Sequence, residues 1–229
     1  MKKNILLFFV MVSVLGCTKD PNSGNSNNSN SENTISLDET EISLYKDDEY
    51  AIHAVSETPL LYTSDDEYHA VVSNNGIVKA RYVGTTTINI SNSSEVIHLK
   101  VNVIPRYTSF SVPNINFGDT KETVISIMGE PDYIQYNGKV FGYYFDGYCP
   151  EWLDVSFEED RVSEYELGFM LTYEDEAKGY VSERYKFQYT HLTTDYYINA
   201  LETVDATMLV GSCKMDARYW GLVFKPYNR

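Results

Sequence analysis

The groups of this chain that could carry out acid–base chemistry are two clusters of carboxylates. They are Glu158-Glu159-Asp160 and Glu174-Asp175-Glu176. A glycosidase uses one carboxyl group as a proton donor and a second as base or nucleophile, held a defined distance apart in a cleft. Both clusters stand where turns are expected between neighbouring elements. We therefore expect them to be solvated surface residues and not catalytic groups.

Other catalytic and metal-binding patterns are weak. The chain has no Gly-x-Ser-x-Gly elbow and no glycine-rich phosphate loop, and His191 is the only His after residue 105. Asp65-Asp66-Glu67 could supply oxygen ligands to calcium but lacks EF-hand spacing. The four His are scattered, with no Cys or His at the spacing of a zinc site. We predict no catalytic residue, no metal site and no cofactor, so the chain is not expected to be an enzyme.

The three Cys stand in different contexts. Cys17 follows an apolar run, whereas Cys149 and Cys213 lie in the C-terminal half. In an oxidising exported compartment the latter two could form a disulfide. A bridge closing about 65 residues would contribute roughly 4 kcal/mol in the chain-entropy model. Two buried free thiols are the alternative, and the sequence does not decide between them.

Residues 1–16 have the pattern of an export signal peptide. Lys2 and Lys3 precede an apolar run, 5–15, that is too short to span a bilayer. The stretch Val14-Leu15-Gly16-Cys17 resembles the lipobox of bacterial lipoproteins, in which the Cys receives a diacylglycerol and the chain is cut just before it. That resemblance implies lipidation at Cys17 and a place in the outer membrane of a Gram-negative bacterium. An ordinary secretory signal with a chance Cys is the alternative.

Charge restricts the partners that the chain can bind. The formal net charge is −15, with 33 acidic and 18 basic residues, and no run of Lys and Arg occurs. Such a chain repels phosphate backbones, so we predict that it does not bind nucleic acid. It also repels anionic lipid, which leaves acylated Cys17 as the expected membrane contact. Residues 17–33, rich in Asn and Ser, bury too little apolar surface to fold and are predicted to be a disordered tether.

Residues 34–105 are predicted to form an all-β sandwich. Short runs of alternating apolar residues are typical of strands, and no helical period occurs. Turn residues such as Asn74-Asn75-Gly76 and Gly84 separate the runs. Several short strands in so few residues indicate a sandwich. The expected strands are 35–37, 42–44, 50–54, 77–80, 87–90 and 96–103.

The same region resembles the bacterial Ig-like group 2 domains of invasin- and intimin-type surface proteins. The resemblance rests on the segments 61–66, 72–80 and 84–88, and on the last strand to Val103. Tyr62 stands where the family often has Trp. The resemblance implies that residues 34–105 are a spacer or an adhesion module and that they carry no chemistry.

Residues 106–229 are predicted to form a separate α+β domain, with helices packed on an antiparallel sheet. A helix is expected over 120–128, capped by Asp119 and Glu122 and stopped at Gly129. Asn137-Gly138 is a strong hairpin signal. A second helix is expected over 194–204. The expected strands are 134–136, 140–145, 152–157, 162–167, 185–189, 207–210 and 219–224.

Residues from about 115 to 167 resemble the SmpA/OmlA family of small outer-membrane lipoproteins and the related repeat of β-lactamase-inhibitor proteins. The resemblance rests on the segments 118–124, 128–131 and 153–157, followed by Arg161-Val162. Members of these families assist outer-membrane protein assembly or bind other proteins, so the resemblance implies a protein partner. Residues 168–229 are either a diverged second copy of the same unit or a different one.

Aromatic residues are concentrated in the C-terminal region. Fifteen of the twenty Tyr lie in residues 106–229, beside Trp152 and Trp220. Such side chains can anchor a protein partner or stack on sugar rings, although in strands they are also ordinary core residues. We predict a lipid-anchored envelope protein whose Ig-like region is a spacer for a C-terminal protein-binding domain. The alternative is a surface adhesin or glycan-binding lipoprotein that uses these aromatics.

Overall fold

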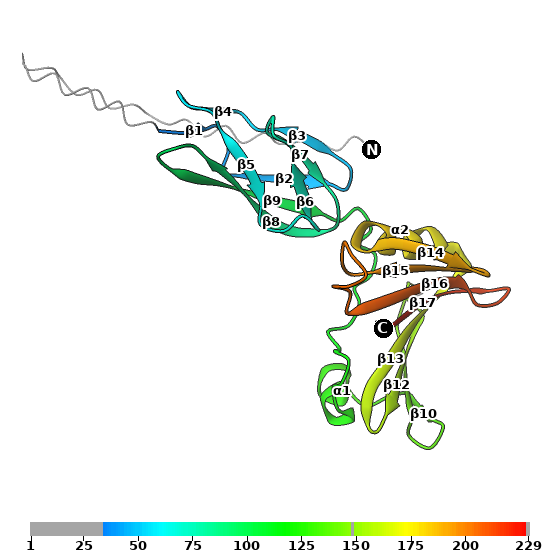
Figure 1. The fold of residues 1–229 in the computed structure, drawn as a ribbon. Coiled ribbons are helices and arrows are strands. Elements are labelled where there is room, and N and C mark those ends of the chain that lie inside the picture. The colour runs from blue at the N-terminus through cyan, green and yellow to red at the C-terminus, as the bar shows by residue number, and fades with distance from the viewer. Residues whose placement is uncertain (1–33, 148, 228–229) are drawn as a thin grey trace, which may run out of the picture. The chain divides into compact units, whose positions relative to one another are not determined.

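The described part of the chain is mostly β, with 48% of the described residues in strands and 11% in helices, and its sheets have a sandwich-like arrangement (Figure 1). The structure is a computed structural model that describes residues 34–147 and 149–227. The predicted signal peptide, the lipidation site Cys17 and the tether lie outside the described residues. The residues that are described fall in one compact unit.

The N-terminal sandwich (residues 34–105) consists of two facing sheets and one extra strand pair. One sheet has the strand order β2-β9-β8-β5, the second has the order β3-β7-β6, and β1 pairs with β4. The strands are β1 (Ser36–Leu37), β2 (Glu41–Tyr45), β3 (Glu49–Ala51), β4 (Ala54–Val55), β5 (Leu61–Ser64), β6 (Ala70–Val72), β7 (Ile77–Ala80), β8 (Gly84–Ser91) and β9 (Val96–Ile104).

Side-chain alternation explains why these residues form strands. In β8, Thr86, Ile88 and Ile90 are buried and their neighbours are not, which is the period of two that a half-buried strand requires. Strand β2 runs parallel to β9, with Ile42 opposite Val101, and both residues belong to the core of the sandwich. Strands β5 and β6 were not predicted by alternation, since Tyr62 is the only large apolar residue that β5 turns inward.

The C-terminal region (residues 106–227) is built on one eight-stranded antiparallel sheet of order β10-β11-β12-β13-β17-β16-β15-β14. The sheet consists of two four-stranded meanders joined through β13 and β17. A helix precedes each meander, so the two halves have the same order of elements. The elements are α1 (Lys121–Met128), β10 (Tyr133–Gln135), β11 (Val140–Tyr144), β12 (Trp152–Glu158), β13 (Arg161–Met170), the 3-10 turn η1 (Leu171–Tyr173), α2 (Glu174–Arg184), β14 (Lys186–His191), β15 (Thr194–Ile198), β16 (Met208–Lys214) and β17 (Tyr219–Pro226).

One hydrophobic core connects both meanders and both helices. It contains Val124 of α1 and Val181 of α2 together with Leu153, Leu167 and Leu222 of the sheet. The core of the N-terminal sandwich is a separate cluster of buried residues. Each region therefore has its own apolar interior.

One helix prediction and one turn prediction for this region need correction. The predicted helix over 194–204 is wrong, because residues 194–198 form β15, in which Tyr197 and Ile198 are both buried. The cluster Glu174-Asp175-Glu176 is not a turn. It is the first turn of α2, where acidic side chains interact favourably with the positive end of the helix dipole.

The first helix and its neighbouring hairpin are close to prediction. Helix α1 begins one residue later than expected, because Thr120 and not Asp119 is the N-cap and its hydroxyl accepts from the backbone N–H of Thr123. Asn137 and Gly138 have positive φ in the turn between β10 and β11, which confirms the hairpin.

Candidate functional site

The helices cover one face of the eight-stranded sheet, and the other face is partly open, with a small buried cluster of Ile198, Ala200, Ala206 and Leu209 at β15 and β16. Residues of β12 and β13 that point to the helices, such as Leu153 and Leu167, are fully buried. Their neighbours Trp152, Asp154 and Glu166 point to the opposite side and remain partly exposed. We call this second side the open face.

Two rows of side chains cross the open face, the first with one residue from each of the eight strands and the second with one residue from each strand except β10. The strand register places these residues directly opposite one another from strand to strand. The first row is Tyr133, Gly142, Asp154, Glu166, Val223, Gly211, Tyr196 and Tyr189. The second row is Tyr144, Trp152, Gly168, Gly221, Cys213, Thr194 and His191.

Glycines beneath the aromatic rings fix those rings on the open face. A Cβ added to Gly142 would lie 1.9 Å from the ring of Tyr133, and one added to Gly168 would lie 2.0 Å from the ring of Trp152. Each ring therefore lies against the backbone of the opposite strand, in space that any other residue would fill. The outward side of each ring is left available for contact.

Two carboxylates face each other across β12 and β13. Asp154 lies directly opposite Glu166, and Tyr133 donates a hydrogen bond to Asp154 across Gly142. Within residues 34–147 and 149–227, no Lys, Arg or His lies within ion-pair distance of either carboxylate. Burial and the nearby charges of Glu164 and Asp154 raise the pKa of Glu166 to about 7. Burial also raises the pKa of Asp154, although the hydrogen bond from Tyr133 acts in the opposite direction.

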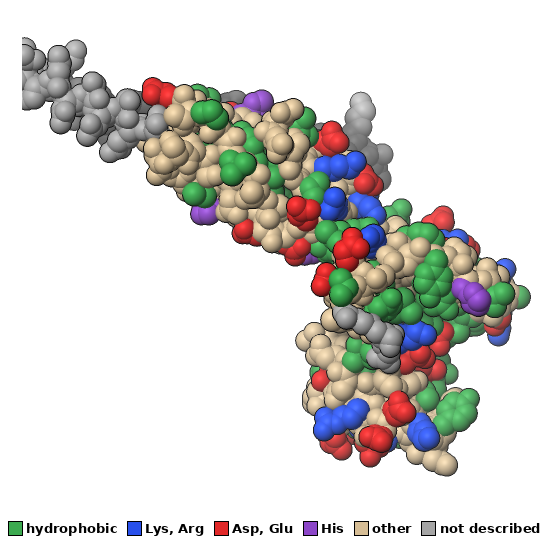
Figure 2. All heavy atoms as spheres, in the orientation of Figure 1, with side chains coloured by type: hydrophobic (Ala, Val, Ile, Leu, Met, Phe, Trp, Pro, Cys, Tyr) green, Lys and Arg blue, Asp and Glu red, His purple; other side chains and the backbone are tan. Residues whose placement is uncertain are grey.

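The far end of the open face is apolar and reaches a sheet edge. Strand β14 is the last strand of the sheet, and Tyr189 on it, opposite Tyr196 of the open face, is 50% exposed. Leu192, in the turn that follows, is also exposed. Figure 2 shows hydrophobic side chains gathered over β14 to β17, whereas acidic side chains are frequent near β10 to β13.

A second feature is the contact between the N-terminal sandwich and the C-terminal end of α2. The last carbonyl groups of a helix have no partner within the helix. Here Lys46 Nζ donates to the carbonyl of Ser182 (2.6 Å), Val83 N to that of Glu183 (2.8 Å), and the Tyr68 hydroxyl to that of Arg184 (2.6 Å). Donors of the sandwich therefore cap three consecutive carbonyls of α2.

Glu183 connects the same helix end to the segment that follows β9. Glu183 is only 4% exposed, and its carboxylate accepts from the backbone N–H groups of Arg106 (2.9 Å) and Tyr107 (3.3 Å). Arg184 also pairs with this carboxylate. A buried carboxylate is costly unless it is paired and hydrogen-bonded, and Glu183 meets both conditions.

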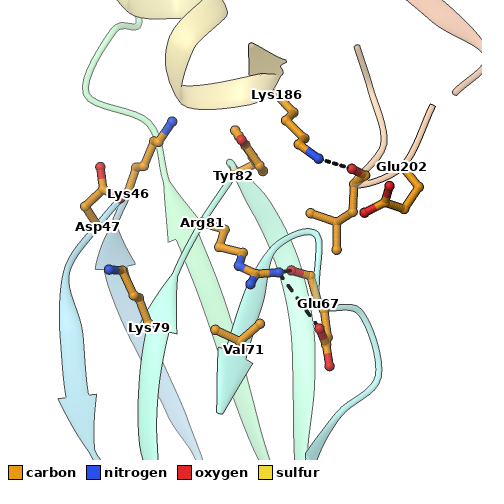
Figure 3. A pocket seen from close by; sticks show the side chains of 10 residues that line it. Lys46, Asp47, Glu67, Val71, Lys79, Arg81, Tyr82, Lys186 and Glu202 are labelled. Atoms are coloured by element: carbon orange, nitrogen blue, oxygen red, sulfur yellow. Dashed lines mark hydrogen bonds and ion pairs between the residues drawn. The ribbon is translucent and has the colours of Figure 1, made fainter. Parts of the chain in front are cut away.

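A cleft of about 720 Å3 lies beside this junction (Figure 3). Its lining includes four cations and three carboxylates, drawn from segments far apart in the sequence: Lys46, Lys79, Arg81 and Lys186, with Asp47, Glu67 and Glu202. Arg81 donates to the Glu67 carbonyl and lies 3.9 Å from its carboxylate, and Lys186 donates to the carbonyl of Leu201. Burial lowers the pKa of Lys46, which is the cation that caps α2. Three of the four cations are thus already bound to groups of the protein itself.

The residues singled out in the sequence do not form a common site. Cys149 and Cys213 are free thiols, each half-buried. Cys149 packs against the core beneath the helices, and its pKa is raised to about 11 by burial and by Glu176, whereas Cys213 belongs to the second row of the open face.

The three acidic residues Asp65, Asp66 and Glu67 each interact with a different partner. Asp65 accepts from Asn89, Asp66 from the backbone of Tyr68, and Glu67 approaches Arg81. Among the described residues, no three His, Cys, Asp or Glu side chains gather closely enough to hold a metal ion. No helix in the described ranges is long and apolar enough to cross a membrane.

The pair Asp154 and Glu166 was missed in the sequence, because the two carboxylates stand twelve positions apart and only the β12–β13 pairing brings them together. The signal that could have located the open face is the series of glycines inside apolar strands: Gly142, Gly168, Gly211 and Gly221.

Comparisons with known proteins give only structural matches, and these have low TM-scores. No model of a known protein family matches the chain, and no curated protein matches it. A structure of domains 4 and 5 of the S-layer protein SbsC aligns with 31% of this chain at 26% identity and a TM-score of 0.29, so the chain spans about half, 51%, of that structure's length. A structure of SbsC domains 5–6 aligns with 84% of this chain and 95% of its own length, at 13% identity and a TM-score of 0.28. Both TM-scores are too low to carry an argument about fold or function.

Proposed function

We propose that this chain is a lipid-anchored cell-envelope protein of the outer membrane, held by acylated Cys17, that binds another protein through the open face. In this proposal the N-terminal sandwich is an Ig-like spacer, and residues 106–229 are an α+β protein-binding domain. The role is one of binding and not of catalysis.

The observation that carries the proposal is the side of the eight-stranded sheet that the helices do not cover. Exposed aromatic side chains beside an unpaired sheet edge are typical of surfaces that bind another protein. The open face carries Trp152 and Tyr144 at one end and Tyr189 at the other, and β14 leaves a sheet edge unpaired in the described structure. Tyr and Trp are enriched among residues that dominate protein interfaces.

Site-specific photo-cross-linking in cells tests this proposal. Tyr144 is 64% exposed on the open face, and replacement by benzoylphenylalanine puts a reactive group there without adding a charge. The matched control is the same replacement at Ile127 of α1, which is 42% exposed on the helix that lies against the other side. Tyr144 should give discrete protein adducts that Ile127 does not.

Two outcomes contradict the proposal. The first is the same set of adducts from both positions, which would indicate nonspecific collision. The second is no protein adduct from Tyr144 together with retention of the protein on isolated envelope polysaccharide. That second result would favour the glycan-binding alternative, in which the fixed rings of Tyr133 and Trp152 stack on sugars.

A further inference from the structure

The strongest unexplained feature of the open face is a pair of carboxylates that face each other without a cation. Like charges directly opposite each other in adjacent strands are destabilising. Asp154 and Glu166 occupy such a pair, and Glu164 adds a third charge on the same face of β13. The hydrogen bond from Tyr133 satisfies one oxygen of Asp154 but brings no positive charge.

The groups around this pair do not neutralise it. On β17 the residue opposite Glu166 is Val223, and the carboxylate of Glu166 reaches over Gly221 toward Met215. Lys225, the cation of β17 on this side, lines a separate shallow hollow together with Glu164. Among the described residues, neither Asp154 nor Glu166 thus has a cation within ion-pair distance.

Aromatic rings flank the carboxylates in positions suited to a cation. Trp152 lies two residues from Asp154 on the same face of β12, and its ring is held against Gly168, two residues from Glu166. The ring of Tyr133 is held against Gly142, on the other side of Asp154. A cation over an aromatic face is attracted by the ring quadrupole, most strongly over Trp. Because the glycines fix both rings, little side-chain freedom is lost on binding.

We propose that the carboxylate–aromatic patch formed by Tyr133, Trp152, Asp154 and Glu166 binds a cationic side chain, Arg or Lys, of the protein partner. This inference rests on the function proposed above, because it defines the chemistry of the partner at the same face. Charge complementarity selects this occupant. A neutral sugar or a purely apolar partner would cover the two carboxylates and leave them without a counter-charge, which is costly.

Binding of an arginine peptide to the full chain in neutral detergent tests the inference, and the two Trp provide an internal control. The probe is acetyl-triarginine amide, and the readout is the indole N–H resonance of each Trp in protein labelled at Trp. Trp152 lies in the patch, whereas Trp220 is buried and donates to Ser212 Oγ in the core. The peptide should shift the Trp152 signal in a saturable manner, leave the Trp220 signal in place, and bind at least tenfold more weakly in high salt.

Two variants separate the patch from the overall charge. Glu166→Gln should weaken peptide binding at least tenfold, and Glu122→Gln, which removes the same charge from exposed α1, should change it less than twofold. Equal effects of the two substitutions, or equal binding of acetyl-triglutamine amide, would overturn the inference, since either result indicates attraction to the net charge or to the rings alone.

The cross-linking experiment distinguishes this inference from the proposed function. If Tyr144 yields adducts that survive the Glu166→Gln substitution unchanged, the open face binds a protein but the cationic contact is wrong. If the peptide binds through Glu166 and no protein adduct forms at Tyr144, the chemistry of the patch stands and the proposed function is contradicted.

Discussion

Trp152 and Tyr133 depend on glycines that leave room for their rings. Neither glycine has a positive φ, so backbone conformation does not require glycine at these positions. The requirement is steric, because the ring of the facing residue occupies the space of a Cβ. The absence of a Cβ at these two glycines therefore determines where the two rings lie on the open face.

Gly168→Ala should displace the ring of Trp152. The new Cβ would lie 2.0 Å from Cε2 of the indole, and overpacking of this kind costs about 1–3 kcal/mol of unfolding free energy. Urea denaturation measures the loss. The control is Gly147→Ala, because a Cβ at Gly147 meets nothing within 4 Å. Equal stability of the two variants would contradict the steric role of Gly168.

Glu166→Gln should change how stability depends on pH. The pKa of Glu166 in the folded protein is raised to about 7, above its ordinary value of 4.5, so the folded state binds this proton more tightly than the unfolded state does. The stability that the protonated group contributes is complete below about pH 4.5 and is lost as the pH rises through about 7. The variant should thus gain stability relative to the natural protein between pH 5 and pH 8.

Glu122→Gln should have the opposite effect on the dependence of stability on pH. Hydrogen bonds from its own backbone N–H and from the Thr120 hydroxyl lower the pKa of Glu122. The ionised Glu122 carboxylate stabilises the folded protein above its ordinary pKa, and this stabilisation is lost as the pH falls. The variant should therefore be less stable than the natural protein near pH 7. Denaturation midpoints measured near pH 7 should rise in Glu166→Gln and fall in Glu122→Gln, relative to the natural protein. A change of the same sign in both variants would contradict the raised pKa of Glu166.

At the scale of elements, α2 is a helix whose C-terminal end is completed by another region. Its last three carbonyls accept from Lys46, Val83 and Tyr68, all of which belong to the N-terminal sandwich. The charge of Lys46 also lies at the negative end of the helix dipole, where a cation is favourable. The stability of α2 therefore depends on residues about a hundred positions away.

Tyr68→Phe should loosen the last turn of α2. The substitution removes a 2.6 Å hydrogen bond to the carbonyl of Arg184 and costs about 1 kcal/mol of unfolding free energy. Amide hydrogen exchange should become faster at the end of α2 and remain unchanged in α1. Tyr136→Phe, at a hydroxyl-bearing side chain that is 74% exposed, is the control and should have no measurable effect.

Elements with a local signal were predictable, and those that depend on distant contacts were not. Trp152–Glu158 alternates in the sequence and forms a strand, the apolar run Val140–Tyr144 forms a second, and Asn137-Gly138 forms the expected turn. Helix α2 has few apolar residues and an internal glycine, and the ring of Tyr107 packs where a Cβ of Gly179 would be. Its helical state therefore comes from tertiary packing, which no local pattern reports.

The candidate site was harder to predict from the sequence than the helices and strands were. Its rows exist only because β13 pairs with β17, which places Gly168 opposite Gly221 more than fifty residues later in the chain. Single apolar or acidic residues could be assigned to strands, but not to a common surface, before that pairing was known.

At the scale of the whole molecule, the proposed function requires attachment through the N-terminal segment. Cys17→Ser should move the protein from the membrane fraction to the soluble fraction, because the chain carries a net charge of −15 and has no other expected lipid contact. Immunoblots of fractionated cells measure the change. A salt wash that releases the natural protein, or a variant that stays with the membrane, would contradict a lipid anchor.

The parallel pairing of β2 with β9 has a mechanical consequence. After the two-residue strand β1, which pairs with β4, the chain runs into β2, and it leaves the sandwich through β9. Five register pairs from Glu41–Lys100 to Tyr45–Ile104 connect β2 and β9. A pull from the two ends loads these strands in opposite directions along their axes, so their ladder must break as a group and not one bond at a time. In single-molecule pulling, the sandwich should resist a higher force when stretched from its ends than when stretched across the β8–β9 hairpin. A protein tethered to a membrane and bound to a partner would carry load along that resistant direction.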